Sequence, residues 1–397
     1  MKDGWRTMTL GEVCEIMNGG TPKTGVPEYW GGSHRWITPA EMGKRLSPYV
    51  RDTERKITDL GLRDSSARML PPYSVILSSR APIGHLVINT EPMATNQGCK
   101  GLIPGSQLQH KFLYYYLSSI VDLLNSIGTG TTFKELSGGR LKEVTIPVPS
   151  LSEQERIVGI LDKAFECIAT AQANAAKNLD NVSALFESHL QSVFADAWRT
   201  SELVTLSDLA TDITDGDHLP PPKSPTGVPF ITIGNIVKET RRIDFADTFT
   251  VPHSYFNALK ANKKPKKGDV LYTVTGSFGI PVIVGESVEF CFQRHIGLIR
   301  PKSETNGAWL CYLLLSPQVF QQAIIGATGT AQKTVSLKVL RGFEVPKVTL
   351  KQQRATVVKL DSISRESQRL TSVYTRKRKA LEAWRMSLLH QAFSGHL

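Results

Sequence analysis

The chain has 397 residues, more than one ordinary hydrophobic core accommodates, so we expect two or more domains. Hydrophobic residues make up 41% and charged residues 21%, a balance typical of folded globular proteins and not of disordered ones. No run of eighteen apolar residues occurs, and Asp3 and Glu12 interrupt the apolar pieces at the N-terminus, so the sequence predicts neither a membrane span nor a signal peptide. The net charge of +11 favours a polyanionic partner without requiring one.

The cysteine pattern excludes two common structural devices. Five cysteines lie far apart in the sequence, at Cys14, Cys99, Cys167, Cys291 and Cys311. They form no Cys-x-x-Cys pair and no Cys/His pair at zinc spacing, and their odd number argues against a disulfide framework. We therefore expect a reducing, cytoplasmic environment and no metal site.

The first part of the chain, residues 1–150, combines short β-like runs with turns rich in glycine and proline. Strands are predicted at 75–79, 86–89 and 144–148. Residues 111–124 (KFLYYYLSSIVDLL) have the spacing of an amphipathic helix. Its three tyrosines have the rings to stack on nucleic-acid bases, but the apolar residues around them favour packing in the core.

A long helix is predicted next, because residues 152–198 contain no proline and only one glycine, Gly159. Its apolar residues recur at spacings of three and four, as in a coiled coil. The predicted seam consists of Ile157, Leu161, Ala164, Ile168, Ala171, Ala175, Val182 and Leu185.

The second part repeats this organisation. Strands are predicted at 230–233, 269–274 and 281–285, and a helix at 308–324. Residues 351–393 lack both proline and glycine, and they carry a second seam of Leu360, Ile363, Leu370, Tyr374, Leu381, Trp384 and Leu388. The net charge is −3 over 151–200 and +7 over 350–397, which favours pairing of the two helices. The basic run 376–379 (RKRK) is either a solvated helix face or a contact for nucleic acid or a partner.

An internal repeat underlies this pattern. GTGTTFKELSGGRL (128–141) aligns with ATGTAQKTVSLKVL (327–340) at an offset of 199, and the alignment continues without a gap into both long helices. Earlier in each half the offset drifts between 194 and 197, with WITPAEM (36–42) matching FITIGNI (230–236). We also align Gly-Leu-Ile at 101–103 with Gly-Leu-Ile at 297–299. The repeat is a duplicated module of one domain and one helix.

These observations predict an α+β fold. Two similar mixed α/β domains, 1–150 and 201–349, are expected to be separated by two long antiparallel helices, 151–200 and 350–397, which form a coiled coil with a pseudo-two-fold internal repeat. A helix of about 40 residues is roughly 60 Å long. Two related domains held by such a spacer would meet a DNA duplex at two half-sites. Because the domain sequences differ, we expect a bipartite, asymmetric target.

Two segments carry a resemblance to a known family. GTTFKELSGGRLKEVTIPVPSLSEQERIVGILD (130–162) and MSLLHQAFSGHL (386–397) resemble the conserved regions of specificity subunits from type I restriction-modification enzymes. The resemblance covers the whole chain. It departs from the family pattern at His396 and at the start of the second helix, which reads LKQQR (350–354) where the family pattern is LSEQER.

The resemblance implies a non-catalytic DNA-specificity subunit of a prokaryotic, cytoplasmic system. Such a subunit binds double-stranded DNA and two methyltransferase (modification) subunits, and in the full complex also restriction-translocase subunits. It implies that this chain binds no cofactor itself: the methyltransferase partner uses S-adenosylmethionine, and the restriction subunit uses ATP and Mg.

Two alternatives remain open, a fragment of a fused methyltransferase and a coiled-coil scaffold or adaptor. The string LPPY (70–73) resembles the Asp/Asn-Pro-Pro-Tyr motif of amino-methyltransferases, but Leu70 stands where that motif needs a polar acceptor. No phosphate-binding GxxxxGK[ST] loop occurs. We predict no catalytic residue.

The DNA-contacting residues are therefore expected in turns and at strand ends. A repeated segment is the best candidate for phosphate contacts, because it is kept in both modules while its neighbours vary. Its members are Thr131, Thr132 and Lys134 in the first module and Thr330, Gln332 and Lys333 in the second.

The other predicted DNA contacts are polar side chains and glycine-turn backbone amides at less similar positions, and several of these side chains are suited to base edges. In the first module these are Asn18, Gly19, Thr21, Lys23, Thr38, Ser79, Arg80, Asn96, Gln97 and Lys100. In the second they are Thr214, Asp215, His218, Asn235, Thr275, Ser277, Gln293, Arg294 and His295. Any of them has the alternative role of satisfying buried backbone groups. The cluster KKPKK (263–267) is either a further backbone contact or a solvated loop.

Overall fold

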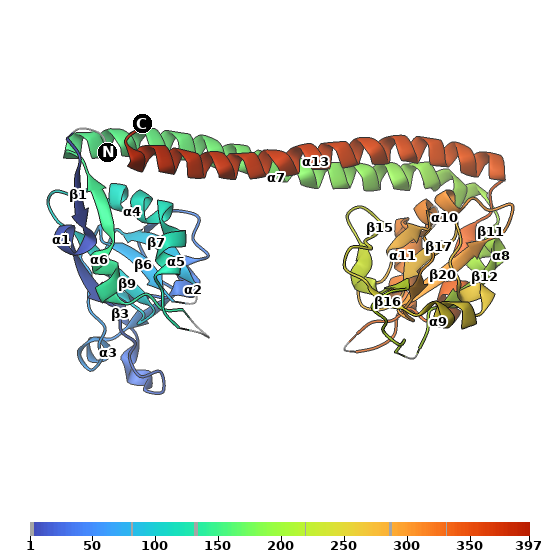
Figure 1. Ribbon diagram of the computed structural model, residues 1–397, viewed down its shortest axis with the longest axis horizontal. Helices are drawn as coiled ribbons and strands as arrows, with labels where there is room; N and C mark the ends of the chain where they lie inside the picture. Colours follow the sequence, from blue (N-terminus) through green and yellow to red (C-terminus); the bar gives the residue numbers. More distant parts are fainter. Residues whose placement is uncertain (1–3, 81, 131–133, 219, 286–287, 331) are drawn as a thin grey trace. The chain divides into compact units, whose positions relative to one another are not determined.

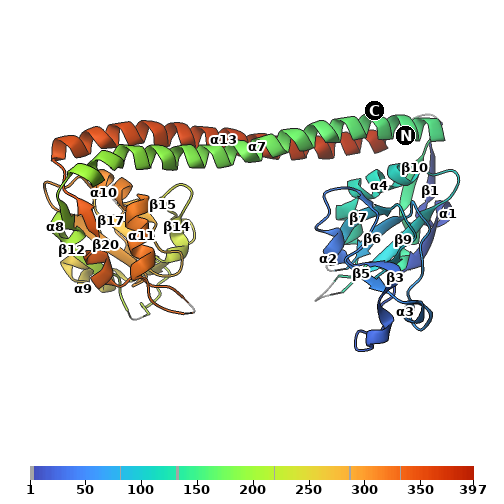
Figure 2. The same cartoon turned by 180° about the vertical axis from the view of Figure 1, so that it is seen from behind.

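The computed structural model describes residues 4–80, 82–130, 134–218, 220–285, 288–330 and 332–397. Contacts between residues divide the chain into two compact units. Unit 1 consists of Met1–Asn174 with Lys377–Leu397, and unit 2 consists of Ala175–Arg376. The helices and strands of both units are labelled in Figure 1, and Figure 2 gives the view from behind. Each unit is described by itself.

Unit 1 is built on two small sheets. The five-stranded sheet has the order β2 (Cys14–Asn18), β9 (Cys99–Pro104), β6 (Val75–Ser79), β7 (Ile83–Asn89) and β4 (Tyr49–Val50). The three-stranded sheet has the order β5 (Arg55–Ile57), β3 (Trp30–Ile37) and β8 (Ala94–Thr95). Strand β1 (Arg6–Thr9) pairs antiparallel with β10 (Thr145–Val148).

The helices of unit 1 are mostly short. They are α1 (Leu10–Val13), η1 (Pro27–Tyr29), α2 (Pro39–Met42), α3 (Asp59–Arg63), α4 (His110–Ser119), α5 (Val121–Ser126) and α6 (Gly138–Glu143). Strand β6 is fully buried because both of its faces are covered. Val75 and Leu77 face the core that contains α4, and Ile76 faces the core on the other side of the sheet, as the twofold alternation of a strand requires.

Unit 2 repeats this strand order, but among the described residues its main sheet has four strands and no edge strand equivalent to β4. Its main sheet runs β12 (Ala210–Asp215), β20 (Ile296–Pro301), β17 (Val270–Thr273) and β18 (Pro281–Ile283). Its second sheet runs β16 (Phe249–Val251), β13 (Val228–Ile231) and β19 (Cys291–Phe292). Strand β11 (Leu203–Thr205) pairs with β21 (Glu344–Pro346) as β1 pairs with β10, and β14 (Ile236–Val237) pairs with β15 (Arg242–Ile243).

The helices of unit 2 also correspond to those of unit 1. They are α8 (Leu206–Leu209), η2 (Ile233–Asn235), α9 (His253–Ala258), η3 (Ala261–Lys263), α10 (Gly307–Leu314), α11 (Pro317–Gly326) and α12 (Leu337–Arg341). Equivalent helices begin in the same way: Thr9 and Glu12 form a capping box at α1, and Thr205 and Asp208 form one at α8. The predicted duplication and the α+β class are confirmed.

Two long helices, α7 (Leu151–Thr200) and α13 (Leu350–Ser394), take part in both units. In unit 1 they run antiparallel, because Arg156 Nη2 donates to the carbonyl of Leu397 at 2.7 Å and Gln172 Nε2 donates to Glu382 at 3.3 Å. The end of α13 therefore lies beside the start of α7 (Figure 2). In unit 2 the core joins Leu190 of α7 to Leu360 of α13. The predicted antiparallel pair is confirmed within each unit.

The helix pair also forms part of each core. In unit 1, Leu389 and Ala392 of α13 are buried among residues of α4, and the ring of Phe393 contacts Phe112 and Tyr116 edge-on. Burying one such side chain stabilises a fold by about 1.5–3 kcal/mol. The sequence correctly places the tyrosines of 111–124 in the core, since Tyr115 and Tyr116 are buried.

The predicted seam is wrong at two positions. Leu185 is 52% exposed and Trp384 is 51% exposed. Four-residue steps replace three-residue steps at both places. Phe186, which follows Val182 by four residues, packs against the core, and the Arg385 guanidinium lies over the Phe165 ring at 5.3 Å.

Two predicted helices are each divided in two. Residues 111–124 form α4 and α5, separated at Ile120, whose φ of −115° and ψ of 20° are not helical. Residues 308–324 form α10 and α11, because Pro317 lacks the N–H that a continuous helix needs and starts a new helix instead. The predicted strand 230–233 ends at Ile231, since Thr232 caps η2.

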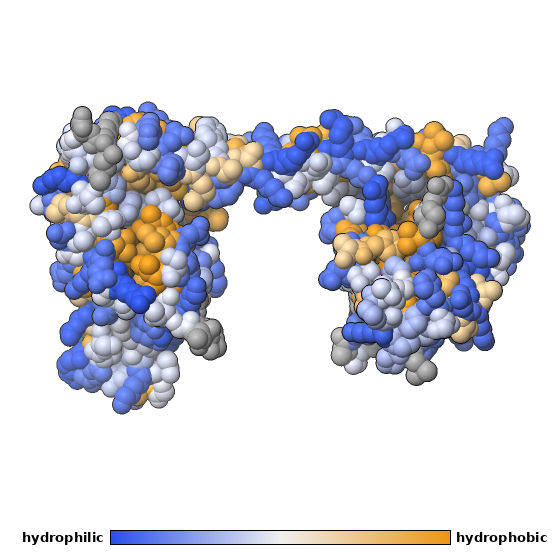
Figure 3. All heavy atoms as spheres, viewed as in Figure 1, coloured by the Kyte–Doolittle hydropathy of each residue, from blue (hydrophilic) through white to orange (hydrophobic). Residues whose placement is uncertain are grey.

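Among the described residues no single helix has the length and apolar character to cross a membrane, and α10 with α11 meets that test only as a bent pair. Trp309, Leu310, Leu313 and Leu314 of α10 are buried in the core. On α11 the side chains of Phe320, Ile324 and Ile325 are exposed. Figure 3 shows such exposed apolar side chains in orange among the hydrophilic surface.

Candidate nucleic-acid interface

A cleft of about 350 Å³ in unit 2 brings together six of the residues predicted to contact DNA. It forms where the end of β12, the loop after β17 and the loop before β20 meet at one edge of the main sheet. The six residues are Asp215, His218, Thr275, Arg294, His295 and Gln332. Neighbouring strands that end at one edge thus collect polar side chains from separate parts of the sequence.

Arg294 is an exposed cation of this cleft. Its Nε donates to Nε2 of His295 at 3.4 Å, and its terminal nitrogens donate no hydrogen bond to any residue that the structure describes. His218 Nε2 lies 2.8 Å from Oδ2 of Asp215. A guanidinium with free terminal nitrogens is suited to the O6 and N7 acceptors of guanine or to a phosphate, and a carboxylate accepts a hydrogen bond from the amino group of cytosine.

The loop that carries Asp215 and His218 is fixed by contacts of Gly216 and Asp217 with neighbouring residues. Gly216 lies so close to Phe292 that a Cβ would come within 2.0 Å of its carbonyl oxygen, so only glycine fits. Lys263 Nζ donates to the Gly216 carbonyl at 3.0 Å, and the Tyr255 hydroxyl donates to Asp217. Burial and that hydrogen bond raise the pKa of Tyr255 above its ordinary value. Of the KKPKK cluster, Lys263 therefore has a structural role.

Unit 1 has an equivalent cluster at the equivalent sheet edge. Asn96 Nδ2 donates to Thr21 Oγ1 at 2.9 Å, and Asn96 Oδ1 accepts from the backbone N–H of Gly98 at 2.8 Å. Arg80 Nη1 lies 3.8 Å from a carboxylate oxygen of Glu135. Gly19 is required beneath them, since a Cβ there would come within 1.9 Å of the Asn96 carbonyl oxygen. Asn18 and Gln97 are exposed at the same edge.

Lys100 differs from the other predicted residues of this cluster. It is only 6% exposed, and burial lowers its pKa, with the nearby positive charge of Arg80 acting in the same direction and the negative charge of Glu135 opposing it. A buried ammonium between these two side chains is suited to position them. We therefore treat Lys100 as a positioning residue and not as a direct DNA contact.

Backbone hydrogen bonds define which residues of the two units are equivalent. Ser79 N donates to Gly98 O at 2.8 Å, and Val274 N donates to His295 O at 2.9 Å. Strand pairing opposes Leu77 to Lys100 in unit 1 and Tyr272 to Gly297 in unit 2. Lys100 is therefore equivalent to Gly297. The alignment of the two Gly-Leu-Ile strings is wrong by one residue, because the identical letters do not occupy the same position in the strand pairing of the two units.

The same equivalence shows that matching positions carry different chemistry. Asn18 corresponds to Asp215, since each faces the residue of β9 or β20 identified above. Arg80 corresponds to Thr275, because they pair with Glu135 and Thr334 respectively. Gln97 corresponds to Arg294 by its place one residue before Gly98 or His295. One scaffold thus presents two different sets of polar groups.

The described phosphate candidates belong to a short hairpin in each unit: Lys134 in unit 1, and Thr330, Gln332 and Lys333 in unit 2. Thr129 and Glu135 exchange backbone hydrogen bonds of 3.0 and 2.8 Å, and Thr328 and Thr334 do the same at 3.0 and 2.8 Å. Each hairpin is attached to the sheet edge by a bond of 2.8 Å, from Leu136 to Ser79 and from Val335 to Val274, and in unit 2 Gly276 N also donates to Lys333 O at 3.0 Å. The exposed members of this set are Lys134, Thr330, Gln332 and Lys333; Thr131 and Thr132 lie outside the described residues.

Several predicted residues have structural roles or lie apart from the clusters. Asn235 is 7% exposed, and its amide oxygen and nitrogen bond Thr232, Asp244 and Asp247. Thr38 caps α2, and Ser79 and Thr214 are buried. Lys23, Ser277 and Gln293 do not line the cleft of unit 2 or bond the cluster of unit 1 among the described residues. These residues are therefore not members of the cluster of unit 1 or the cleft of unit 2.

Sequence reasoning missed Glu135 and Thr334. They follow Lys134 and Lys333 directly, and the repeat already showed that this position differs between the modules. The string LPPY forms a turn and no catalytic motif. The Pro71 carbonyl accepts hydrogen bonds from Asn89 Nδ2 at 2.8 Å and Ser74 Oγ at 2.7 Å, and Leu70 is buried, so this string closes a structural turn.

A family model described as "Type I restriction modification DNA specificity domain" matches the sequence twice, over residues 2–178 and 199–375. The chain belongs to this family. The two matches correspond to the two copies of the repeat.

Curated relatives carry the same description. The type I restriction enzyme MjaIX specificity subunit of Methanocaldococcus jannaschii is 38% identical over 159 residues, which cover 40% of this chain and 37% of that protein. The EcoR124I/EcoR124II specificity subunit of Escherichia coli is 34% identical over 166 residues, 40% of each protein. These two matches span about two fifths of the relatives' length. The EcoBI specificity subunit of E. coli is 20% identical over 357 residues, 82% of this chain and 74% of that protein.

Solved structures agree in fold. A chain from a study of complex assembly and conformational transition of the type I R-M system has a TM-score of 0.79 at 20% identity, covering 100% of this chain and 99% of its own. The HsdS subunit from Thermoanaerobacter tengcongensis has a TM-score of 0.58 at 21% identity, covering 100% and 98%. At these identities the likeness establishes the fold.

Proposed function

We propose that this chain is the DNA-recognition subunit of a type I restriction-modification system and reads a bipartite, asymmetric target. The observation that carries the proposal is the pair of equivalent sheet edges with different side chains. Asn18, Arg80 and Gln97 in unit 1 correspond to Asp215, Thr275 and Arg294 in unit 2. A protein that read one repeated sequence twice would need the same groups at both edges.

Within this proposal, phosphate contacts are made by the hairpins and base contacts by the clusters at the sheet edges. The hairpins that carry Lys134 and Lys333 have the same design in both units, which suits phosphate contacts that hold no sequence information. The clusters at the sheet edges differ, which suits base-edge contacts. We keep residues 1–150 and 201–349 as the two target-recognition domains and 151–200 and 350–397 as the spacer helices.

The partners follow from the family. We infer that two methyltransferase subunits and, in a complete system, restriction-translocase subunits assemble on this chain, and that they supply the S-adenosylmethionine and ATP chemistry. The chain itself then contributes recognition and no catalysis. Support for this inference comes from the family membership and from the structural use of LPPY as a turn.

Reconstitution tests the proposal. The purified chain, its methyltransferase partner and the mixture are each incubated with genomic DNA and labelled S-adenosylmethionine, and the modified sites are sequenced. Only the mixture is expected to methylate, at a two-part sequence. Methylation by the chain alone would support the fused-enzyme alternative, and a mixture without sequence preference in binding or methylation would support the scaffold.

A further inference from the structure

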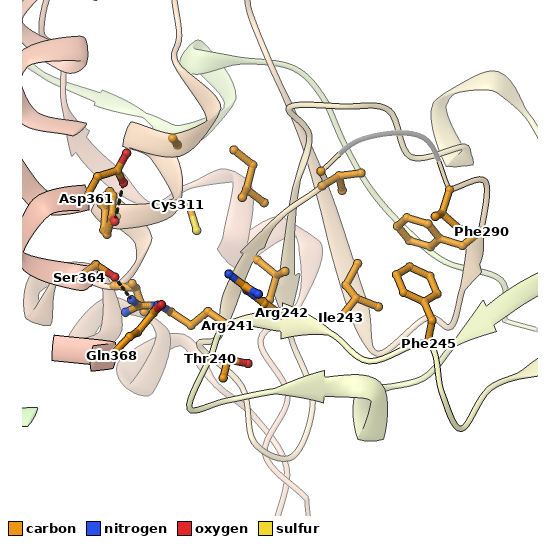
Figure 4. Close-up of a pocket in the computed structure, with 18 residues that line it drawn as sticks. Thr240, Arg241, Arg242, Ile243, Phe245, Phe290, Cys311, Asp361, Ser364 and Gln368 are labelled. Atoms are coloured by element: carbon orange, nitrogen blue, oxygen red, sulfur yellow. Dashed lines mark hydrogen bonds between the residues drawn. The ribbon is translucent and has the colours of Figure 1, made fainter. Parts of the chain in front are cut away.

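Unit 2 contains a second pocket, of about 460 Å³, on a different side of the domain from the cleft described above. Its volume lies within the range of about 300–1,000 Å³ that is usual for small-molecule sites. Figure 4 shows Asp361, Ser364 and Cys311 at one side of the pocket and the rings of Phe245 and Phe290 at the other. The pocket therefore combines one carboxylate, that of Asp361, with the side chains of Arg241 and Arg242 and with apolar walls.

The internal repeat explains why this pocket exists. Gln109 caps α4 and Asn306 caps α10, and their backbone N–H groups donate to Gln154 at 2.8 Å and to Gln353 at 2.7 Å. The equivalence of these caps makes Lys111 of unit 1 equivalent to Ala308 of unit 2. Ala308 lines the pocket. A long side chain in unit 1 is thus replaced by a methyl group.

Unit 1 shows what the equivalent carboxylate binds. Asp162 accepts one hydrogen bond from the Tyr115 hydroxyl and a second from Lys111 Nζ, at 2.7 Å. The Lys111 ammonium also lies 5.5 Å from the centre of the Tyr49 ring. A carboxylate, a tyrosine hydroxyl and an aromatic face thus surround a primary ammonium group on an alkyl chain, which is a favourable environment for such a cation.

In unit 2 the same carboxylate is only half satisfied. Asp361 Oδ1 accepts a hydrogen bond from the Tyr312 hydroxyl at 2.8 Å, as Asp162 does from Tyr115. Its other oxygen accepts no hydrogen bond from any residue in the described parts of the chain. Two arginines line the pocket, Arg241 and Arg242. Arg241 donates to Ser364 Oγ at 3.2 Å and lies over the Phe186 ring at 4.8 Å, and among the described residues neither arginine forms an ion pair with Asp361.

We propose that this pocket binds a free primary alkylamine, whose ammonium group takes the place at Asp361 that Lys111 takes at Asp162. The four methylene groups of a lysine side chain indicate a ligand with about four or five carbon atoms. Val282, Val284 and Leu315 supply apolar wall for that chain. The site is separate from the proposed DNA-reading clusters, so this inference does not depend on them.

Calorimetric titration of the full chain with n-butylamine and with 1,5-diaminopentane, at a pH where both are protonated, tests the proposal. 1-Butanol is the neutral control. We expect one amine site per chain, no measurable binding of the alcohol, and a rise in the melting temperature of about 3 °C or more at roughly ten times the dissociation constant.

Three variants separate the contributions. Asp361→Asn keeps the acceptor for Tyr312 and removes the charge, so amine affinity should fall at least tenfold. Ala308→Lys supplies the cation internally, so binding should disappear while the melting temperature of the ligand-free chain rises. Lys260→Ala, at an exposed residue of unit 2 that does not line the pocket, should bind as the original chain does and serves as the control. Equal affinity for butanol and butylamine, or unchanged affinity in Asp361→Asn, would overturn the proposal.

One further measurement fixes the source of the cation. Assembly of Ala308→Lys with the methyltransferase subunit should equal that of the original chain if the ligand is a free amine. Weaker assembly would assign the ammonium to a lysine of the partner and would refute the free-amine site. DNA binding is measured in the same samples, so a failure of the recognition proposal is seen separately from a failure of this one.

Discussion

Replacing Gln154 with leucine is expected to destabilise unit 1 selectively. The Gln154 side chain is completely buried at the start of α7. Its Oε1 accepts from the Gln109 N–H at 2.8 Å, and its Nε2 donates to the carbonyls of Gln107 and Pro149, both at 2.9 Å. Leucine fills a similar volume but leaves these three backbone groups without their partner.

The size of the effect follows from those three groups. A buried polar group that loses its partner costs about 1–3 kcal/mol, and since two of the bonds are only partly buried we expect a total of about 2–5 kcal/mol. With a typical urea dependence, this shifts the unfolding midpoint of unit 1 by about 1 M or more. That is a large part of the stability of an ordinary domain, about 5–15 kcal/mol.

Hydrogen exchange read by mass spectrometry distinguishes the units. In Gln154→Leu, protection should fall in α4 and in the unit 1 part of α7, while β17 and β20 of unit 2 keep theirs. The matched variant Gln353→Leu should give the opposite pattern, because Gln353 makes the equivalent bonds to Asn306, Glu304 and Val348. A loss below about 0.5 kcal/mol, or one spread equally over both units, would refute the reasoning.

Three further predictions concern DNA binding. Lys134→Ala and Lys333→Ala should each weaken binding to all sequences and reduce the slope of log affinity against log salt by about 0.9, measured by fluorescence anisotropy; an unchanged slope would exclude a phosphate contact. Arg294→Gln should relax sequence preference at one base pair of one half-site, at a cost of about 1–3 kcal/mol, as read from methylated sites; relaxation in both half-sites would contradict the assignment. Exchange of residues 1–150 for another recognition domain should change one half-site only, and sequencing that finds both halves changed would end the modular interpretation.

The repeat allowed most of the fold to be predicted from the sequence. Helical periodicity and the lack of proline located both long helices, because such patterns extend over many residues. The points at which a predicted helix divides into two were harder to locate. Pro317 was an available signal for the end of α10, but the division at Ile120 has no such marker, since it depends on how α4 and α5 pack against the sheet.

The candidate site was predicted less well than the fold, for a physical reason. Polarity identifies residues that need hydrogen bonds, but it does not say whether DNA or the protein supplies them. Asn235 and Ser79 were selected for their polarity, and both are buried. Arg294 and His218 were selected on the same grounds, and both are exposed and line the cleft. The one-residue error in aligning the two Gly-Leu-Ile strings arose because strand register depends on pairing across the sheet, and three matching letters do not determine that pairing.

The return of α13 to unit 1 has a consequence for truncated forms of the chain. Leu389, Ala392 and Phe393 of α13 complete the core around α4, although α4 lies far earlier in the sequence. A chain that stops shortly after residue 376 would retain every strand of both sheets in unit 1 and still lose the helix that covers its core. Loss of the segment after residue 376 should therefore destabilise unit 1, whose strands all lie in the first half of the sequence.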